Sequence, residues 1–326
     1  MQAQFFVFRI ENFLPQKIAG KDQTLHNILG KGSAGMAQRR TDLAMEAHAL
    51  WQEQAGEGER LQGVRAREDQ VQGFAAHVVD VLDERGADAL GKPQGRYVTV
   101  ELDGLLRREE DSFARAVQAV AQLLQPMLPP TGEALVVGLG NRAITPDLVG
   151  PLAVEHTLVT RHLVEGLAQF GHLRPVAALA AGVLATTGVE SGRLIQAVAA
   201  QLRPACIVAV DALASRSVER LCRTVQLSDT GIVPGSGVGN HRMALSRETL
   251  GVPVLAVGAP TVVDASTLMM DLLGRQDDEG LPGRELFVTP REVDSRVADL
   301  ARVIGYGVSL ALNPELSVEE LTLLVE

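Results

Sequence analysis

The segment VVGLGNRAITPD, residues 136–147, is the part of this chain that decides its fold. The apolar run 134–137 is typical of a buried β-strand, and Gly138 and Gly140 allow a tight turn after it. A Thr-Pro pair follows, and Asp147 then precedes an apolar pattern with helical spacing. An aspartate there is typical of a helix cap. It also stands at the carboxyl end of a strand, where open α/β sheets place their functional sites.

The order of strand, loop and helix continues along the chain. This alternation predicts an α/β fold with a mainly parallel sheet and helices on both faces, an α/β/α sandwich, with an additional β-containing portion towards the N-terminus. Residues 53–70 are polar and are predicted to form a surface loop. The expected strands are 74–82, 96–102, 134–137, 175–180, 205–210 and 254–257, and the expected helices are 40–50, 84–90, 109–128, 148–170, 190–202, 264–273 and a last one starting at Thr289-Pro290.

Composition limits the classes of function. The 326 residues are 46% hydrophobic, which suffices for a sizeable core. The net charge of −10 and the lack of a basic stripe argue against direct nucleic-acid binding. The sequence contains no run of 18 apolar residues, so no membrane-spanning helix is predicted. Acidic Glu11 makes the N-terminus a poor signal peptide. Cys206 and Cys222 form no disulfide framework, so a cytoplasmic location is expected.

A second aspartate, Asp211, follows the apolar run 206–210 and therefore also stands at the end of a predicted strand. Two carboxylates held close together share a proton, and the pair supplies one base and one acid. Such a pair can activate water against a peptide carbonyl. The local pattern fits a helix cap or an ion pair with Arg216 equally well. The spacing of 64 residues between Asp147 and Asp211 leaves open whether the fold brings them together.

Other motifs predict less. Residues 228–231 contain Asp-Thr-Gly, as in pepsin-like proteases, but those are all-β with two such loops, so a turn is expected here. The loop 235–240 could cradle a phosphate, yet it lacks the spacing of a dinucleotide or P-loop motif. His156 and His162 are not four residues apart, so no zinc site is predicted, and Asp264 fits a helix cap. We expect no cofactor and no bound metal.

Long motifs occur in a fixed order between about Arg40 and Pro314. They are RTDLA at 40–44, GKP at 91–93, YVT at 97–99, GLGN at 138–141, TPD at 145–147, DALA at 211–214, DTGI at 229–232, PGSGVGN at 234–240 and PTVVD at 260–264. In these motifs the chain resembles the bacterial spore germination protease family, which consists of endopeptidases.

The resemblance implies more than the residues show alone. It implies an α/β core similar to that of hydrogenase-maturation peptidases, and cleavage of small acid-soluble spore proteins, which coat DNA in dormant spores. It also implies a self-processing zymogen made in the developing spore, and a homotetramer. The family's two proposed catalytic aspartates match Asp147 and Asp211, the pair already suggested by the strand ends.

The resemblance divides the chain into a pro-segment or N-terminal extension, residues 1–42, and a protease domain, residues 43–326. The family's pro-segment is usually short. A start at Met36 would give such a length, and residues 1–35 would then be an upstream extension or a lineage-specific tail.

The family's substrates are cut after an acidic residue and before an apolar one, with alanine close behind and another acid beyond. Residues 42–46, DLAME, have this pattern, so we expect self-cleavage between Asp42 and Leu43. The same residues fit a capped amphipathic helix beginning at Thr41 or Asp42. Because a carboxylate pair must hold one proton to work, mild acid, about pH 5–6, is expected to favour the reaction.

Two other functions remain open from the sequence. A nickel-dependent maturation peptidase would need metal ligands beside the carboxylates, and no histidine suits that role. A non-catalytic module could bind a nucleotide on the loop 235–240.

Overall fold

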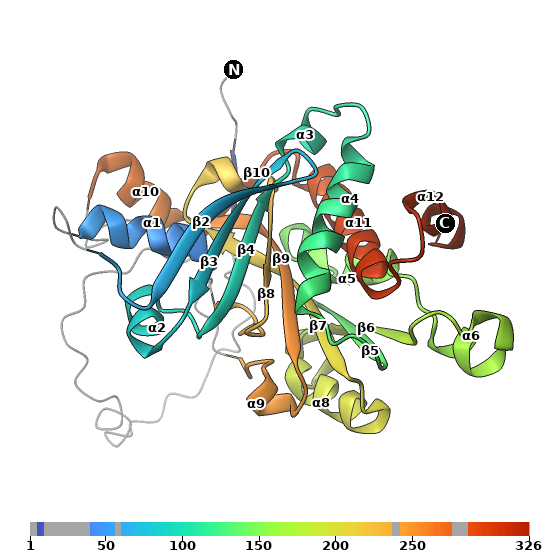
Figure 1. Ribbon diagram of the computed structural model, residues 1–326. Helices are drawn as coiled ribbons and strands as arrows, with labels where there is room; N and C mark the ends of the chain where they lie inside the picture. Colours follow the sequence, from blue (N-terminus) through green and yellow to red (C-terminus); the bar gives the residue numbers. More distant parts are fainter. Residues whose placement is uncertain (1–4, 10–39, 56–59, 237–241, 276–285, 326) are drawn as a thin grey trace.

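The computed structural model of the chain describes residues 5–9, 40–55, 60–236, 242–275 and 286–325 (Figure 1). Its centre is one ten-stranded sheet in the order β2-β3-β4-β8-β9-β7-β5-β6, and β10 joins β9 to β1. The strands are β1 Phe5–Arg9, β2 Val64–Val71, β3 Phe74–Val81, β4 Gly95–Glu101, β5 Ala134–Leu139, β6 Val176–Gly182, β7 Cys206–Ser215, β8 Thr224–Ser228, β9 Val254–Asp264 and β10 Leu286–Pro290.

Helices cover both faces of this sheet. The α-helices are α1 Ala44–Gln54, α2 Glu84–Leu90, α3 Asp103–Leu106, α4 Ser112–Leu124, α5 Val149–Glu155, α6 Arg161–Gly166, α7 Leu184–Thr187, α8 Ser191–Leu202, α9 Arg247–Leu250, α10 Ala265–Leu273, α11 Val293–Leu312 and α12 Val318–Val325. Short 3₁₀ turns are η2 Gln125–Met127, η3 Thr145–Asp147, η4 Ala168–Phe170 and η5 Val218–Arg220. None of the helices in these described ranges is long and apolar enough to cross a membrane.

The strands β6, β5, β7 and β9 are parallel and form the centre of the α/β unit. The flanks are antiparallel: β2, β3 and β4 form the N-terminal β portion, which joins the centre through β8. The predicted α/β class, with helices on both faces and added N-terminal strands, is therefore confirmed.

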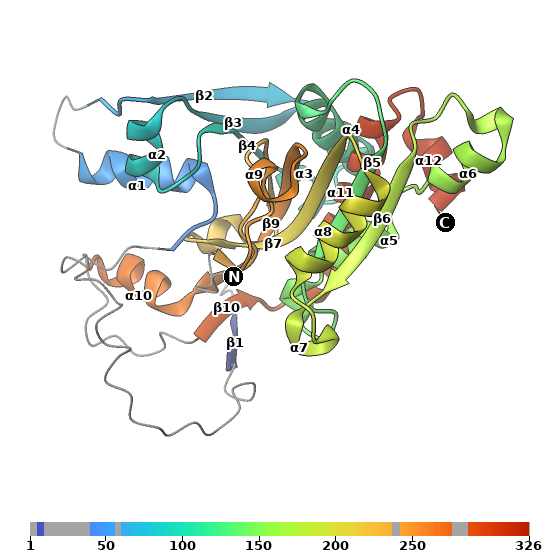
Figure 2. The same ribbon diagram turned by 90° about the horizontal axis from the view of Figure 1, so that it is seen from below.

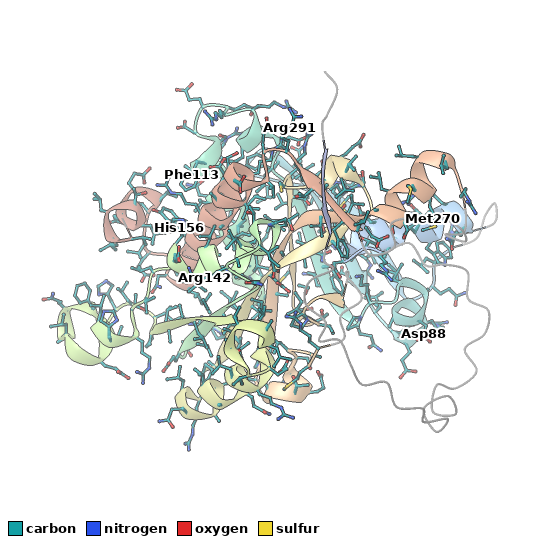
Figure 3. All side chains as sticks on the ribbon, turned by 180° about the vertical axis from the view of Figure 1, so that it is seen from behind. Asp88, Phe113, Arg142, His156, Met270 and Arg291 are labelled. Carbon is teal, nitrogen blue, oxygen red and sulfur yellow. The ribbon has the colours of Figure 1, made fainter. Side chains whose placement is uncertain are left out.

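The central strands are buried on both sides because helices pack on each face. One face is covered by α4, α5, α11 and α12, and the other by α8. A smaller cluster joins α1 and α2 to β3 and β4, and Figure 2 shows these two helices on one side of the N-terminal strands. On the first face, the rings of Phe113 and His156 meet Tyr306 of α11 edge to face; Figure 3 labels Phe113 and His156.

Three element predictions were wrong. The helix expected over 148–170 is divided into α5, α6 and η4, because Thr160 accepts a hydrogen bond from the Val176 N–H and ties this stretch to β6. The polar loop expected over 53–70 contains the edge strand β2, whose six middle residues are all exposed and so show no apolar alternation. Thr289 and Pro290 lie in β10, and α11 begins only at Val293.

Candidate active site

A sharp turn after β5 positions Asp147. Gly140 has a φ of 121°, which favours glycine, and a Cβ there would lie 2.0 Å from the Asp147 main-chain oxygen. The chain thus folds back so that the Asn141 N–H donates to Asp147 Oδ2 at 2.6 Å. Helix α5 has Leu148 at its N-cap and receives no side-chain cap, so Asp147 is not the cap of that helix.

Two further glycines bring α5 directly onto the strands. A Cβ on Gly138 would lie 2.3 Å from the Gly150 oxygen. A Cβ on Gly150 would lie 2.5 Å from the Val210 oxygen of β7. The main chain of α5 therefore packs against β5 and β7 without intervening side chains, and this packing holds the Asp147 turn beside β7.

Asp211 lies inside β7, not at its end as the sequence predicted, because β7 continues to Ser215. Its neighbour β5 stops pairing at Gly138, opposite Val210, so Asp211 is the first β7 residue beyond that pairing. Its carboxylate accepts from the Ala212 N–H at 2.9 Å, and the residue is 5% exposed. The alternative ion pair with Arg216 is not formed: that guanidinium binds Glu53 and Asp271.

The two aspartates are close enough to influence each other's ionisation. Burial raises the pKa of Asp211 well above 3.8, and the charge of Asp147 raises it further. Burial also raises the pKa of Asp147, to about 6, against the opposing effects of the Asn141 N–H and the Arg242 charge. The charge of an ionised Asp147 therefore favours the protonated form of the buried Asp211, so the pair can share one proton.

A third carboxylate, Asp42, docks beside this pair. The Asp42 N–H donates to the Ala214 oxygen at 2.9 Å, and Asp42 Oδ2 accepts from the Ala214 N–H at 2.8 Å. Its other oxygen accepts from Ser236 Oγ at 2.9 Å. The contact forms where the register between β7 and β9 shifts, between Leu213 and Ala214. The Asp42 charge contributes to the raised pKa of Asp211, so the predicted cleavage segment lies next to the predicted carboxylate pair.

The bond predicted to be cut is held on both sides. The Asp42 carbonyl oxygen accepts from Lys92 Nζ and from Gln226 Nε2, each at 3.0 Å. Leu43 and Ala44 are completely buried, and the Ala44 N–H donates to Gln226 Oε1 at 2.7 Å.

The predicted capping of α1 by Thr41 or Asp42 is wrong. Helix α1 begins at Ala44, and its N-cap residue, Leu43, is extended. The Thr41 hydroxyl instead accepts from the Leu43 N–H at 3.0 Å, across a bend at Asp42.

Glu46, the second acidic residue of the DLAME segment, is buried in a pocket of hydrogen-bond donors. Glu46 is only 2% exposed. Burying a negatively charged carboxylate costs much free energy unless hydrogen-bond donors surround its oxygens, and here they do. The donors are Thr41 Oγ1, Ser215 Oγ, the N–H groups of Arg216 and Ser217, and the Arg220 guanidinium.

A cavity of about 930 Å³ adjoins the docked segment. Asp42, Lys92, Tyr97, Gln226 and Gly258 contribute to its walls, whereas Asp147 and Asp211 do not line it. The docked segment thus lines this cavity through Asp42, whereas the carboxylate pair does not.

The remaining motifs have structural roles or lie partly outside the described residues. Asp229 accepts from the Arg96 N–H in a turn, as expected for the Asp-Thr-Gly sequence. Asp264 caps α10 by accepting from the Thr267 N–H. Residues 237–240 of the glycine loop are not among the described residues, and neither are 10–39 of the predicted pro-segment. Within the parts of the chain that are described, no group of three or more His, Cys, Asp or Glu side chains could hold a metal ion.

Residues 44–274 match the family model described as germination protease. The chain belongs to the germination protease family. Relatives named germination protease include one from Caldanaerobacter subterraneus subsp. tengcongensis, 40% identical over 88% of this chain and 98% of its own length. Another, from Bacillus velezensis, is 38% identical over 85% of this chain and 94% of its own length.

The chain is also similar to the solved structure of a [NiFe] hydrogenase maturation protease, HycI from Thermococcus kodakarensis KOD1. The two are 19% identical, with a TM-score of 0.34, over 57% of this chain and 98% of that one. An overlap of that extent carries no information on the site. The family match itself contains Asp147, Asp211, Lys92 and Gln226, and it begins immediately after Leu43.

Proposed function

We propose that this peptidase degrades small acid-soluble spore proteins and is made as a zymogen that cuts itself between Asp42 and Leu43. Asp147 is its base and Asp211 its acid. The observation that carries the proposal is the docking of Asp42 on Ala214, three residues along β7 from Asp211. A chain segment with the substrate pattern thus lies within electrostatic reach of a buried carboxylate pair.

The one-proton state of the pair supports a simple sequence of proton transfers. Asp147, ionised above about pH 6, accepts a proton from water as the water oxygen attacks the carbonyl carbon. Asp211, protonated, supplies a proton to the nitrogen that leaves when the C–N bond breaks. The pair then returns to its first state by moving one proton from Asp147 to Asp211.

The pKa of Asp147 changes the pH at which activity is expected. The sequence predicted that mild acid favours the reaction. With a pKa of about 6, however, Asp147 loses its base function below that pH. Activity that needs an ionised Asp147 should therefore fall as pH drops through about 6.

The contacts of the docked segment support the proposed substrate class. The Asp42 carboxylate accepts hydrogen bonds from the Ala214 N–H and from Ser236 Oγ. The Glu46 carboxylate accepts them from a set of donors that includes Arg220. A substrate with acidic residues at these two positions would present the same groups. The homotetramer implied by the family resemblance is part of the same proposal.

The test is incubation of the purified full chain with a small acid-soluble spore protein, with the cut bonds read by mass spectrometry and the new N-terminus read by sequencing. We expect cuts after acidic residues in the substrate and a processed chain beginning at Leu43. Asp147→Asn should abolish both, and Asp229→Asn, a change at the structural turn, should abolish neither. Wild-type activity retained in Asp147→Asn would refute the proposed mechanism.

A further inference from the structure

Lys92 is unusual both in the sequence and in its surroundings. It is the only lysine after residue 31, where every other basic side chain apart from histidine is arginine. A lysine ammonium is a compact point charge, whereas arginine presents a broad planar fork. The residue keeps some exposed surface, but its amino group is enclosed, and burial lowers its pKa against the opposing charges of Asp42 and Glu46.

The partners of this amino group are carbonyl oxygens. Lys92 Nζ donates to the Thr41 oxygen at 3.1 Å and to the Asp42 oxygen at 3.0 Å. Among the described residues, no carboxylate forms an ion pair with Lys92 within 4.0 Å. Enclosing an ammonium is costly when its nearest partners are neutral. The positive charge is therefore directed at two consecutive peptide groups, one of which contains the Asp42–Leu43 bond.

Gln226 provides the second donor to the same oxygen. Its amide orientation is set by its partners, since Oε1 accepts from the Ala44 N–H at 2.7 Å while Nε2 donates to the Asp42 oxygen at 3.0 Å. The side chain thus bridges the Asp42–Leu43 bond, binding the carbonyl before it and the N–H of the residue after Leu43.

The sheet register places this side chain on the same face as Asp211. Gln226 of β8 is opposite Gly258 of β9, and Gly258 is opposite Asp211 of β7. Two strand spacings separate the Cα atoms of Gln226 and Asp211 by roughly 10 Å. The Leu213 side chain, two residues along β7 from Asp211, covers Gly258 between them, since a Cβ on Gly258 would lie 2.6 Å from Leu213 Cγ.

We propose that Lys92 and Gln226 form the pocket that binds and polarises the carbonyl oxygen of the bond that is cut, first in the chain itself and then in the substrate. This inference rests on the proposed self-cleavage at Asp42–Leu43. As water attacks, the oxygen gains negative charge, and the two donors already lie at hydrogen-bond distance from it. Donors fixed in advance around a developing oxyanion stabilise the transition state more than the ground state. Lys92 and Gln226 are thus catalytic residues that donate hydrogen bonds to the developing oxyanion, and Asp147 and Asp211 move protons.

The experiment measures the single-turnover rate of self-cleavage in the full chain at pH 7.5, followed by mass spectrometry. Removing one oxyanion donor typically lowers the rate by about 10²–10³-fold, and we expect this for Lys92→Met and for Gln226→Leu. The melting temperature of each variant checks folding. Arg85→Met is the matched control, since Arg85 is an exposed cation that binds Asp83 and Gln62 at the surface.

A rescue experiment distinguishes polarisation of the Asp42 carbonyl by Lys92 from a purely structural role of Lys92. In Lys92→Cys, alkylation with 2-bromoethylamine joins the cysteine sulfur to an aminoethyl group with loss of bromide, which restores an ammonium at nearly the lysine position. We expect the self-cleavage rate to rise at least tenfold on alkylation. The wild-type chain, whose Cys206 and Cys222 are buried, should not respond.

The outcomes distinguish the two proposals. A wild-type chain that never cuts at Asp42–Leu43 overturns both. A wild-type chain that cuts there, together with a Lys92→Met variant that cuts at the same rate, overturns the carbonyl pocket alone. Faster release of the segment in Lys92→Met would also overturn it, because Lys92 would then only tether the segment.

Discussion

Replacing Asp147 by asparagine should raise the free energy of unfolding of the protein and, at the same time, abolish its activity. Burial raises the pKa of Asp147 from 3.8 to about 6, so the folded state favours the protonated carboxyl and resists its ionisation at neutral pH. A shift of about two pKa units corresponds to about 3 kcal/mol, since each unit is 1.36 kcal/mol. Asparagine carries no charge, and its Oδ1 can still accept from the Asn141 N–H.

The sign of the effect depends on pH. Because the folded pKa lies above the unfolded one, the ionisation cost is absent below about pH 4, grows between about pH 4 and 6, and is complete above pH 6. The variant should therefore match the wild type at pH 4 and exceed it by up to about 3 kcal/mol at pH 7.5. With an unfolding entropy of about 2.1 cal/mol/K per residue, the melting temperature rises by roughly 4 °C for a chain of this length.

Asp80→Asn is the control of opposite sign. Burial raises the pKa of Asp80, but hydrogen bonds and charges from Arg96 and Arg67 outweigh it, so the net pKa is lowered. Its ionised form stabilises the fold, and this variant should melt lower than the wild type at neutral pH. Scanning calorimetry at fixed protein concentration between pH 4 and 8 measures both. An Asp147→Asn variant with the wild-type melting temperature at every pH would refute the assignment of Asp147 as a base whose pKa is raised by burial.

Asp211→Asn should lower the proteolysis rate by about 10²–10⁴-fold, the usual cost of losing one member of an acid/base pair; near wild-type cleavage with unchanged melting would exclude the residue from catalysis. Gly140→Ala places a Cβ 2.0 Å from the Asp147 main-chain oxygen at a φ of 121°, so both melting temperature and activity should fall, and a fully active, equally stable variant would show that the turn tolerates a side chain. Glu46→Gln should reduce the free energy of unfolding by about 1–3 kcal/mol, because a buried acceptor of charge-assisted hydrogen bonds is replaced, and an unchanged urea midpoint would contradict this. Activity should survive extensive chelation; its loss in chelator, with recovery on adding a single metal, would favour a metal-dependent peptidase.

The sequence was sufficient to predict the central unit of the fold. The apolar runs of β5 and β7 and the glycine turn after β5 are local signals, so the α/β class followed from them. The edge strand β2 left no such signal, because its middle residues face solvent and are all polar or small. The helix over 148–170 could not be divided correctly, since its interruption depends on a contact between Thr160 and β6 that forms only in the folded chain.

The candidate site was predictable only in part. Both aspartates could be selected because each follows an apolar run in the sequence, and the charges of Asp147 and Asp42 both act on the buried Asp211. No local sequence pattern predicts the proposed roles of Lys92 and Gln226. These roles depend on the sheet register and on the docking of Asp42, which is 50 residues from Lys92 and 184 residues from Gln226 in the sequence. Lys92, the only lysine after residue 31, was a clue present in the sequence.

The central claim is that Asp147 and Asp211 share one proton and cut peptides with it. The most direct measurement is the pH dependence of kcat/KM for a small acid-soluble spore protein, compared between the wild type and Asp147→Asn. We predict that the wild-type rate rises with pH with a midpoint near 6, the pKa of Asp147, and that the variant stays at least about 10²-fold lower throughout. An Asp147→Asn variant that retains the wild-type rate and the same rise near pH 6 would contradict the claim.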